Sequence, residues 1–190
     1  MQGAPYRYTI LSHSVVSAQQ CPGGLPSSEV ADFLTVHNNL RSNISSGNFV
    51  AKGQQMPPAK TRIPDLQWDC ELEHEAQQYA DRCIFEHSGA PNEGENLYET
   101  WGTQPMDISG KAESAAESWA NEFQQFGWPS IQLTPETFQT GIGHATQMAW
   151  ADTTKIGCGM ASCRDGHGVL VVCRYVQQGN YLNQNVYEPQ

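Results

Sequence analysis

The chain has 190 residues, which is enough for one well-buried core and short for two domains. Twenty acidic residues stand against ten basic ones, a formal net charge of −10, and without a lysine and arginine cluster this surplus argues against nucleic-acid binding. No stretch approaches the roughly 20 apolar residues that a membrane-spanning helix needs, so no transmembrane segment is expected.

Residues 1–20 are interpreted separately from the fold. Their apolar stretch ends in small residues, as before a signal-peptidase site, but Ser12, His13 and Ser14 interrupt it. We interpret residues 1–20 as a weak or truncated leader, or as a cloning remnant. Residues 21–190 are predicted to form a single domain.

Two helices are predicted in the first half of the chain. Ser27 or Ser28 can cap the first, in which His37 and Arg41 continue an apolar stripe. The members of that stripe are Val30, Phe33, Leu34, Leu40 and Ile44. After a Gly- and Pro-rich loop, Asp69 can cap a second helix. Its inward face is predicted to carry Leu72, Ala76, Tyr79, Ala80 and Cys83.

The second half mixes helices with strands. Ser109 can cap a third helix, which is predicted to run to about Phe126, and Thr134 can cap another that has proline at its first position. Large apolar and small residues then alternate at 156–160, and a turn precedes the buried-strand run at 169–173. This order lacks a regular βαβ rhythm, so it predicts an α+β fold with an antiparallel sheet covered by helices.

The six cysteines predict a disulfide-stapled extracellular protein. Their number is even, none lies in the CxxC pairs of zinc ribbons or redox motifs, and disulfides persist in oxidising compartments. Six reduced thiols in a cytosolic protein are the alternative. Asn43 begins a glycosylation sequon, which fits a secreted chain.

Four segments, in order, resemble the signatures of the CAP superfamily of cysteine-rich secretory, antigen 5 and pathogenesis-related proteins. They are HNNLR at 37–41, GENL at 94–97, GHATQMAW at 143–150, and CRY at 173–175 with GNY at 179–181. The cysteine placement is similar to that of secreted venom allergen-like proteins of parasitic nematodes. The resemblance implies a three-layer α-β-α sandwich with a central antiparallel sheet and a large central cleft.

The resemblance also implies a disulfide pattern, one of 15 that six cysteines allow. Two pairs follow the family, a helix-to-sheet staple and a cross-strand staple, and the third is what remains. The pairs are Cys21–Cys70, Cys83–Cys163 and Cys158–Cys173. The sequence departs from the family at Ala145, where an aromatic residue is usual, and at Gln177, where proline is common.

A cavity tetrad is transferred by motif: His87, Glu95, Glu122 and His144. Imidazoles with carboxylates suit a weakly bound divalent zinc or magnesium ion, held by His87 and His144. The glutamates could instead satisfy buried backbone donors. Neither a G-x-S-x-G nor an H-E-x-x-H motif is present, and Ser88 beside His87 does not by itself make a nucleophile, so no catalytic residue is assigned.

The leading interpretation is a secreted, non-enzymatic protein that binds a sterol or a fatty acid and acts as an extracellular effector or immunomodulator. The resemblance points to a sterol loop at 98–108, with Tyr98, Trp101 and Pro105. A fatty acid could lie between the first helix and the helix carrying His144. The alternatives are a metal-dependent hydrolase that uses the tetrad, and an adhesion or receptor-binding module with a vestigial cavity.

Overall fold

The computed structural model describes residues 20–190, so the leader interpretation lies almost wholly outside the described residues. In chain order the elements are α1 (Ser27–Ser45), β1 (Val50–Ala51), β2 (Gln54–Gln55), β3 (Gln67–Trp68), α2 (Cys70–Ala80), β4 (Gly94–Trp101), α3 (Lys111–Ala120), α4 (Glu122–Phe126), α5 (Pro135–Gln139), α6 (Gly143–Ala149), β5 (Lys155–Cys163), the 3-10 turn η1 (Arg164–Gly166) and β6 (Gly168–Val176).

The main sheet has the strand order β3-β5-β6-β4. The hairpin β5–β6 pairs antiparallel with Cys158 opposite Cys173, and β4 pairs antiparallel with β6. The predicted antiparallel sheet is therefore confirmed for its three long strands. The two-residue β3 differs, because it runs parallel to β5 before the chain turns into α2.

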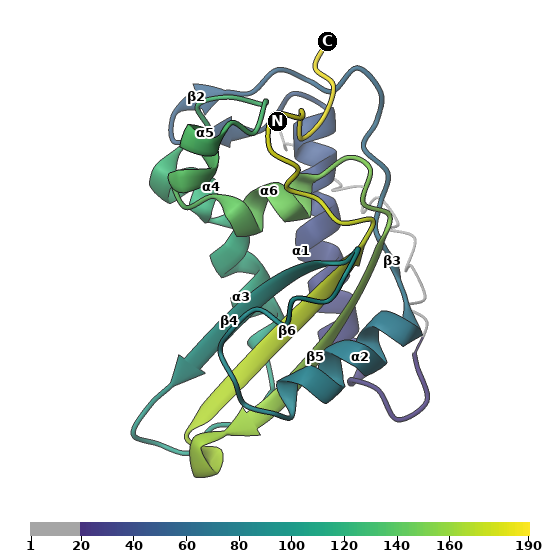
Figure 1. The fold of residues 1–190 in the computed structure, drawn as a ribbon, viewed down its shortest axis with the longest axis vertical. Coiled ribbons are helices and arrows are strands. Elements are labelled where there is room, and N and C mark those ends of the chain that lie inside the picture. Colours follow the sequence, from purple (N-terminus) through teal and green to yellow (C-terminus); the bar gives the residue numbers. More distant parts are fainter. Residues whose placement is uncertain (1–19) are drawn as a thin grey trace, which may run out of the picture.

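Helices cover both faces of this sheet (Figure 1). Helix α2 lies on one face, and α1 and α3 lie on the other. Successive side chains of β6 point to opposite faces of the sheet, so the strand contributes to two hydrophobic clusters. Val171 and Tyr175 face the larger core beneath α1 and α3, whereas Leu170 and Val172 face α2. The three-layer α-β-α arrangement follows from a sheet that is apolar on both faces.

The alternation of large and small residues in β5 has a steric reason. A Cβ atom at Gly157 would lie 2.2 Å from the backbone nitrogen of Glu73, and one at Gly159 would lie 2.3 Å from that of Gln77. Both contacts are with the backbone of α2. The glycines let this helix pack directly against the strand.

Two of the four predicted helix caps are confirmed. The Asp69 carboxylate accepts from two backbone N–H groups of α2, and the Thr134 hydroxyl accepts from Thr137 N. The serine caps were wrong, because the N-cap residue of α1 is Pro26 and that of α3 is Gly110.

A residue distant in sequence caps α3 instead. The buried Glu29 of α1 accepts from Gly110 N at 2.9 Å and Ala112 N at 3.1 Å, since α1 packs beside α3. The predicted third helix also breaks at Asn121 into α3 and α4. Cys83 was wrongly placed on α2, because that helix ends at Ala80.

Three disulfides staple the layers, with the pairing that the family resemblance implies. Cys21–Cys70 joins the first described residues to the start of α2. Cys83–Cys163 joins the segment after α2 to the end of β5, and Cys158–Cys173 crosses the hairpin. No cysteine among the described residues is free.

A buried hydrogen-bond network joins the four motif segments. His37 Nδ1 donates to the carbonyl of Phe33, so the Tyr175 hydroxyl donates to His37 Nε2, at 2.9 Å. The Asn96 amide donates to the same hydroxyl and to the carbonyl of His144, each at 3.2 Å. The Tyr175 oxygen therefore connects α1, β4 and β6, and the Asn96 amide extends the network to the start of α6.

The environment of His37 predicts a pH dependence of stability. Complete burial, reinforced by the charge of Arg41, lowers the pKa of His37 to about 3. Below pH 6.5 the unfolded chain gains a proton there that the folded chain refuses, so stability is lost as the pH falls from 6.5 toward 3. The loss at pH 5 should be about 2 kcal/mol.

Urea unfolding of His37→Asn at pH 7 and pH 5 checks this. The variant should be less stable at pH 7, and its further loss on acidification should be about 2 kcal/mol smaller than that of the parent chain. His74→Asn, which replaces an exposed histidine, is the control. Equal acid sensitivity of His37→Asn and the parent would contradict the assignment.

Candidate functional site

All four tetrad residues line one cavity of about 260 Å³ at the start of β4. They reach it from different elements: His87 from the segment after α2, Glu95 from β4, Glu122 from α4 and His144 from α6. Residues separated by up to 57 positions in the chain are thus brought to one place, as the resemblance implies for these four.

The first histidine–carboxylate pair is anchored on β4. His87 Nδ1 donates to Glu95 Oε1 at 3.0 Å, Ser88 N donates to the same oxygen, and Ser88 Oγ donates to Oε2. The hydrogen bond to Glu95 raises the pKa of His87. Burial favours a higher pKa for Glu95, but the donors from His87 and Ser88 outweigh it and hold that pKa below its usual value.

The second pair lies between α4 and α6. His144 Nδ1 donates to Glu122 Oε1 at 2.5 Å, and Ala145 N donates to Oε2 at 3.0 Å. The His144 ring also stacks on Trp119, with a centroid distance of 6.0 Å and an interplanar angle of 23°. Ala145 therefore contributes through its backbone N–H, which every residue type except proline would supply.

The two histidine–carboxylate pairs share one hydrogen-bond arrangement. In each, a carboxylate accepts from Nδ1 of the imidazole, which leaves Nε2 of the neutral ring as a lone-pair donor. A carboxylate behind the ring is the usual support of a metal-ligating histidine. This leaves the Nε2 atoms of His87 and His144 free for a metal ion, with Glu95 and Glu122 as supports of the rings and not as direct ligands.

Another group of sulfur and carboxylate atoms does not fit a metal. Cys21, Cys70 and Glu73 lie close together, but the two sulfurs form a disulfide and offer no thiolate. The Glu73 carboxylate is also occupied, because it accepts from Leu25 N at 2.6 Å and from Trp68 Nε1 at 2.7 Å.

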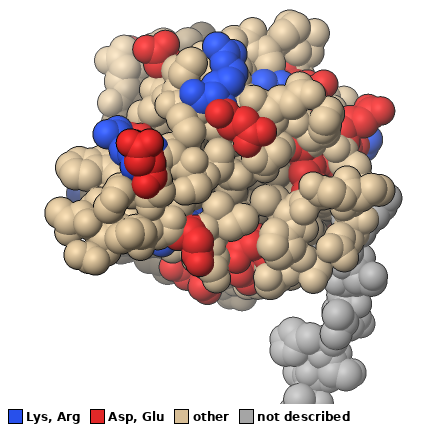
Figure 2. Space-filling view, turned by 90° about the horizontal axis from the view of Figure 1, so that it is seen from below, with Lys and Arg blue, Asp and Glu red and all other residues tan. Residues whose placement is uncertain are grey.

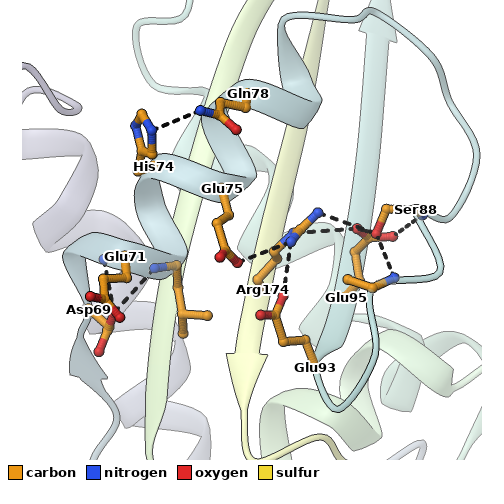
Figure 3. Close-up of polar contacts among 11 residues, drawn as sticks. Asp69, Glu71, His74, Glu75, Gln78, Ser88, Glu93, Glu95 and Arg174 are labelled. Atoms are coloured by element: carbon orange, nitrogen blue, oxygen red, sulfur yellow. Dashed lines mark hydrogen bonds and ion pairs between the residues drawn. The ribbon is translucent and has the colours of Figure 1, made fainter.

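The sequence analysis did not identify Arg174, which lies among several carboxylates beside the cavity (Figure 3). Its Nη1 lies 3.2 Å from Glu75 of α2 and 3.0 Å from Glu93, and its Nε lies 3.8 Å from Glu95. Burial and the adjacent Glu75 carboxylate raise the pKa of Glu93. The CRY segment places Arg174 on the α2 face by alternation, but only the fold shows which carboxylates meet it there.

Gln147 of α6 contacts both the C-terminal segment and the loop before β5. Its Oε1 accepts from Gly179 N at 2.9 Å, and its Nε2 donates to Thr153 Oγ1 at 3.1 Å. A Cβ atom at Gly94 would lie 2.0 Å from that same Oε1. The glycine that opens β4 is therefore required by the glutamine of α6.

The structure does not bring the predicted sterol residues together. Successive residues of a strand point to opposite faces, so Tyr98 and Trp101 point apart. Tyr98 packs toward the α1 and α3 core, whereas Trp101 shares the face of Leu97 and is 67% exposed. Pro105 lies exposed in the following loop.

The predicted position of the fatty-acid groove was wrong. Arg41 and Met148 close the interface between α1 and α6, since Arg41 Nη1 donates to the Met148 carbonyl and Met148 is fully buried. A groove of about 640 Å³ lies instead between α1 and α3, where Val36, Leu40 and Phe49 contribute apolar surface.

The surface agrees with the charge analysis. Seen from below, acidic and basic side chains are interspersed among uncharged ones, with no continuous basic area on this face (Figure 2). Asn43, in the glycosylation sequon, is exposed near the end of α1. No helix among residues 20–190 combines the length and apolarity needed to cross a membrane.

Comparison with known proteins supports the resemblance. The sequence model of the cysteine-rich secretory protein family matches residues 34–175. Ancylostoma secreted protein of Ancylostoma caninum is 36% identical over 179 residues, which cover 89% of this chain but 41% of that protein. Venom allergen 5 of Microctonus hyperodae is 32% identical over 162 residues, covering 81% and 68%.

Solved structures show the same relationship. BmVAL-1 matches with a TM-score of 0.84 and 34% identity, covering 90% of this chain and 88% of that one. NaASP2 with Zn²⁺ matches with a TM-score of 0.83 and 33% identity, covering 90% and 91%. The chain spans less than half the length of the Ancylostoma secreted protein.

The contact between Gly94 and Gln147 gives a testable prediction. Gly94→Ala should lower the free energy of unfolding by about 1–3 kcal/mol, because the new methyl group must displace Gln147 from Gly179 N. Gly102→Ala, just past the other end of β4, is the matched control, since its methyl group would meet only the flexible end of Met106, at 3.3 Å. Chemical denaturation measures both, and equal losses would contradict the steric argument.

Proposed function

Because the chain belongs to the cysteine-rich secretory protein family, we propose that it is a non-enzymatic extracellular effector that carries a fatty acid in the groove between α1 and α3. The observation behind this proposal is the groove itself, about 640 Å³ in volume, with apolar surface from Val36, Leu40 and Phe49. Three disulfides and the names of the secreted and venom relatives support an extracellular location.

The groove has the chemistry of an acyl-chain site. Its apolar residues lie along α1 and the segment after it, and polar residues of α3 and α4, such as Glu117 and Gln124, form the opposite side. Burying about 400 Å² of acyl chain would gain about 10 kcal/mol before association costs of several kcal/mol. A dissociation constant on the order of tens of micromolar follows.

A divalent metal at the tetrad is a second proposed activity. Two imidazoles whose Nδ1 atoms are held by carboxylates favour it, and a zinc-bound relative has the same fold. A bound ion would supply Lewis acidity there. Two histidine ligands leave coordination positions open, so the site differs from a closed structural zinc site.

The contacts of the glutamates favour binding over hydrolysis. Both oxygens of Glu95 and both of Glu122 already accept hydrogen bonds from the protein. A general base needs a free oxygen within reach of the attacking water. Ser88 donates to Glu95 and not to His87, so a Ser–His pair is not formed either.

Effector activity through an extracellular receptor is part of the proposal. If the protein acted as an adhesion module alone, receptor binding would be independent of the groove and of the tetrad.

A sterol is the second ligand class, and the exposed Trp101 with Pro105 is its proposed contact. Tyr98 is left out of that contact because it points to the other face of β4.

Fatty-acid binding is tested with labelled palmitate. Val36→Gln places an amide in the groove and should weaken binding about 5–10-fold. Val50→Gln, which changes an exposed valine outside the groove, should leave the affinity unchanged. Trp101→Ala should reduce the binding of cholesterol sulfate and leave the binding of palmitate unchanged. No palmitate binding at concentrations up to about 1 mM, or equal effects of the two valine variants, would refute the carrier proposal.

Metal binding is tested by zinc calorimetry and by chelation. His87→Ala and His144→Ala should each remove most of the affinity, and Glu122→Gln should weaken it about 10–100-fold. His74→Ala, at an exposed histidine outside the cavity, is the control. Chelation should leave the melting temperature within about 2 °C of its original value, because the disulfides and the core remain. Unfolding by a chelator would show that the metal is structural.

A further inference from the structure

We propose that the C-terminal cleft, formed by residues 61–64, 150–154 and 177–188, binds a short neutral oligosaccharide. The cleft has a volume of about 760 Å³. None of the tetrad residues lines it, and it shares no lining residue with the groove between α1 and α3. The site is therefore separate from both proposed activities.

Three aromatic side chains line the cleft: Trp150, Tyr181 and Tyr187. Trp150 and Tyr187 are almost fully buried, whereas Tyr181 is 46% exposed. The ring of Tyr181 lies 6.2 Å from that of Trp150, at an interplanar angle of 58°. An exposed ring in a concave site offers a flat apolar surface to the C–H face of a sugar ring.

The polar lining suits hydroxyl groups. The side chains of Gln177, Gln178, Gln184 and Asp152 make no hydrogen bond with the described part of the chain. Each amide offers both donors and an acceptor, and a sugar hydroxyl is likewise both donor and acceptor. A saccharide can therefore satisfy this lining without bringing any charge.

The charges of the cleft select against anionic ligands. Arg62 is the single cation among the lining residues, and its Nη2 already contacts both carboxylate oxygens of Asp65, at 2.8 Å. The carboxylates of Asp152 and Glu188 have no such cationic partner within residues 20–190. Sulfated or uronic saccharides and acidic peptides would meet repulsion here, so a neutral saccharide fits best.

The backbone holds these side chains in place. Ala151 N donates to the carbonyl of Val186 at 2.8 Å, and Lys60 N donates to that of Glu188 at 2.7 Å. The hydroxyl of Thr153 donates to the carbonyl of Gln177 at 2.7 Å. Because the three segments are tied to one another, ligand binding requires little ordering of the protein.

The test is titration with chitotetraose, cellotetraose and maltotetraose, followed by NMR and calorimetry. At least one should bind with a dissociation constant on the order of 0.1–1 mM. Tyr181→Ala should weaken that binding about 10-fold, and Tyr181→Phe should preserve it because the ring remains. Leu182→Ala is the control, since Leu182 is 48% exposed beside Tyr181 but does not line the cleft.

Several outcomes would overturn the proposal. One is that no neutral tetrasaccharide shifts NMR signals of the cleft at concentrations up to about 10 mM. Another is that a heparin-derived tetrasaccharide or an acidic peptide binds more tightly than all three neutral probes. A third is that Leu182→Ala weakens binding as much as Tyr181→Ala. Palmitate and zinc binding should be unchanged by Tyr181→Ala, so failure here is distinguishable from failure of the groove or tetrad proposals.

Discussion

The buried guanidinium of Arg41 constrains much of this structure. It lies in α1, is completely inaccessible and forms no ion pair with a carboxylate of residues 20–190. Four backbone carbonyls satisfy it instead, those of Pro64, Met148, Trp150 and Thr153, at 2.7–2.9 Å. A buried cation is tolerated only where such acceptors are in place. Burial lowers the pKa of Arg41 to about 10, which still leaves it charged at neutral pH.

The carbonyls that hold Arg41 belong to segments that build the proposed sites. Met148 lies in α6, the helix that carries His144, and Trp150 lines the C-terminal cleft. The positions of the tetrad cavity and of the cleft are therefore both fixed relative to α1. The groove between α1 and α3 shares the same helix, so three separate surfaces depend on one rigid element.

Histidine chemistry differs sharply across this scaffold. His37 is fully buried, and its low pKa makes it a neutral structural link between α1 and Tyr175. His87 is well exposed and faces a carboxylate, so its pKa is raised. The same side chain is thus structural in one motif and a candidate metal ligand beside another, and burial with local charge decides which.

Hydrophobic spacing in the sequence predicted most of the helices, the hairpin and the inward faces, and local capping signals located the starts of α2 and α5, since these patterns are local properties. The motif resemblance added the disulfide pairs and the tetrad. Only the tertiary structure decided that Glu29 caps α3, that the groove adjoins α3 and not α6, and that Tyr98 and Trp101 point apart. Each of these depends on which elements pack together or on the register of a paired strand. Burial across the layers sets such relations, and no local pattern encodes them.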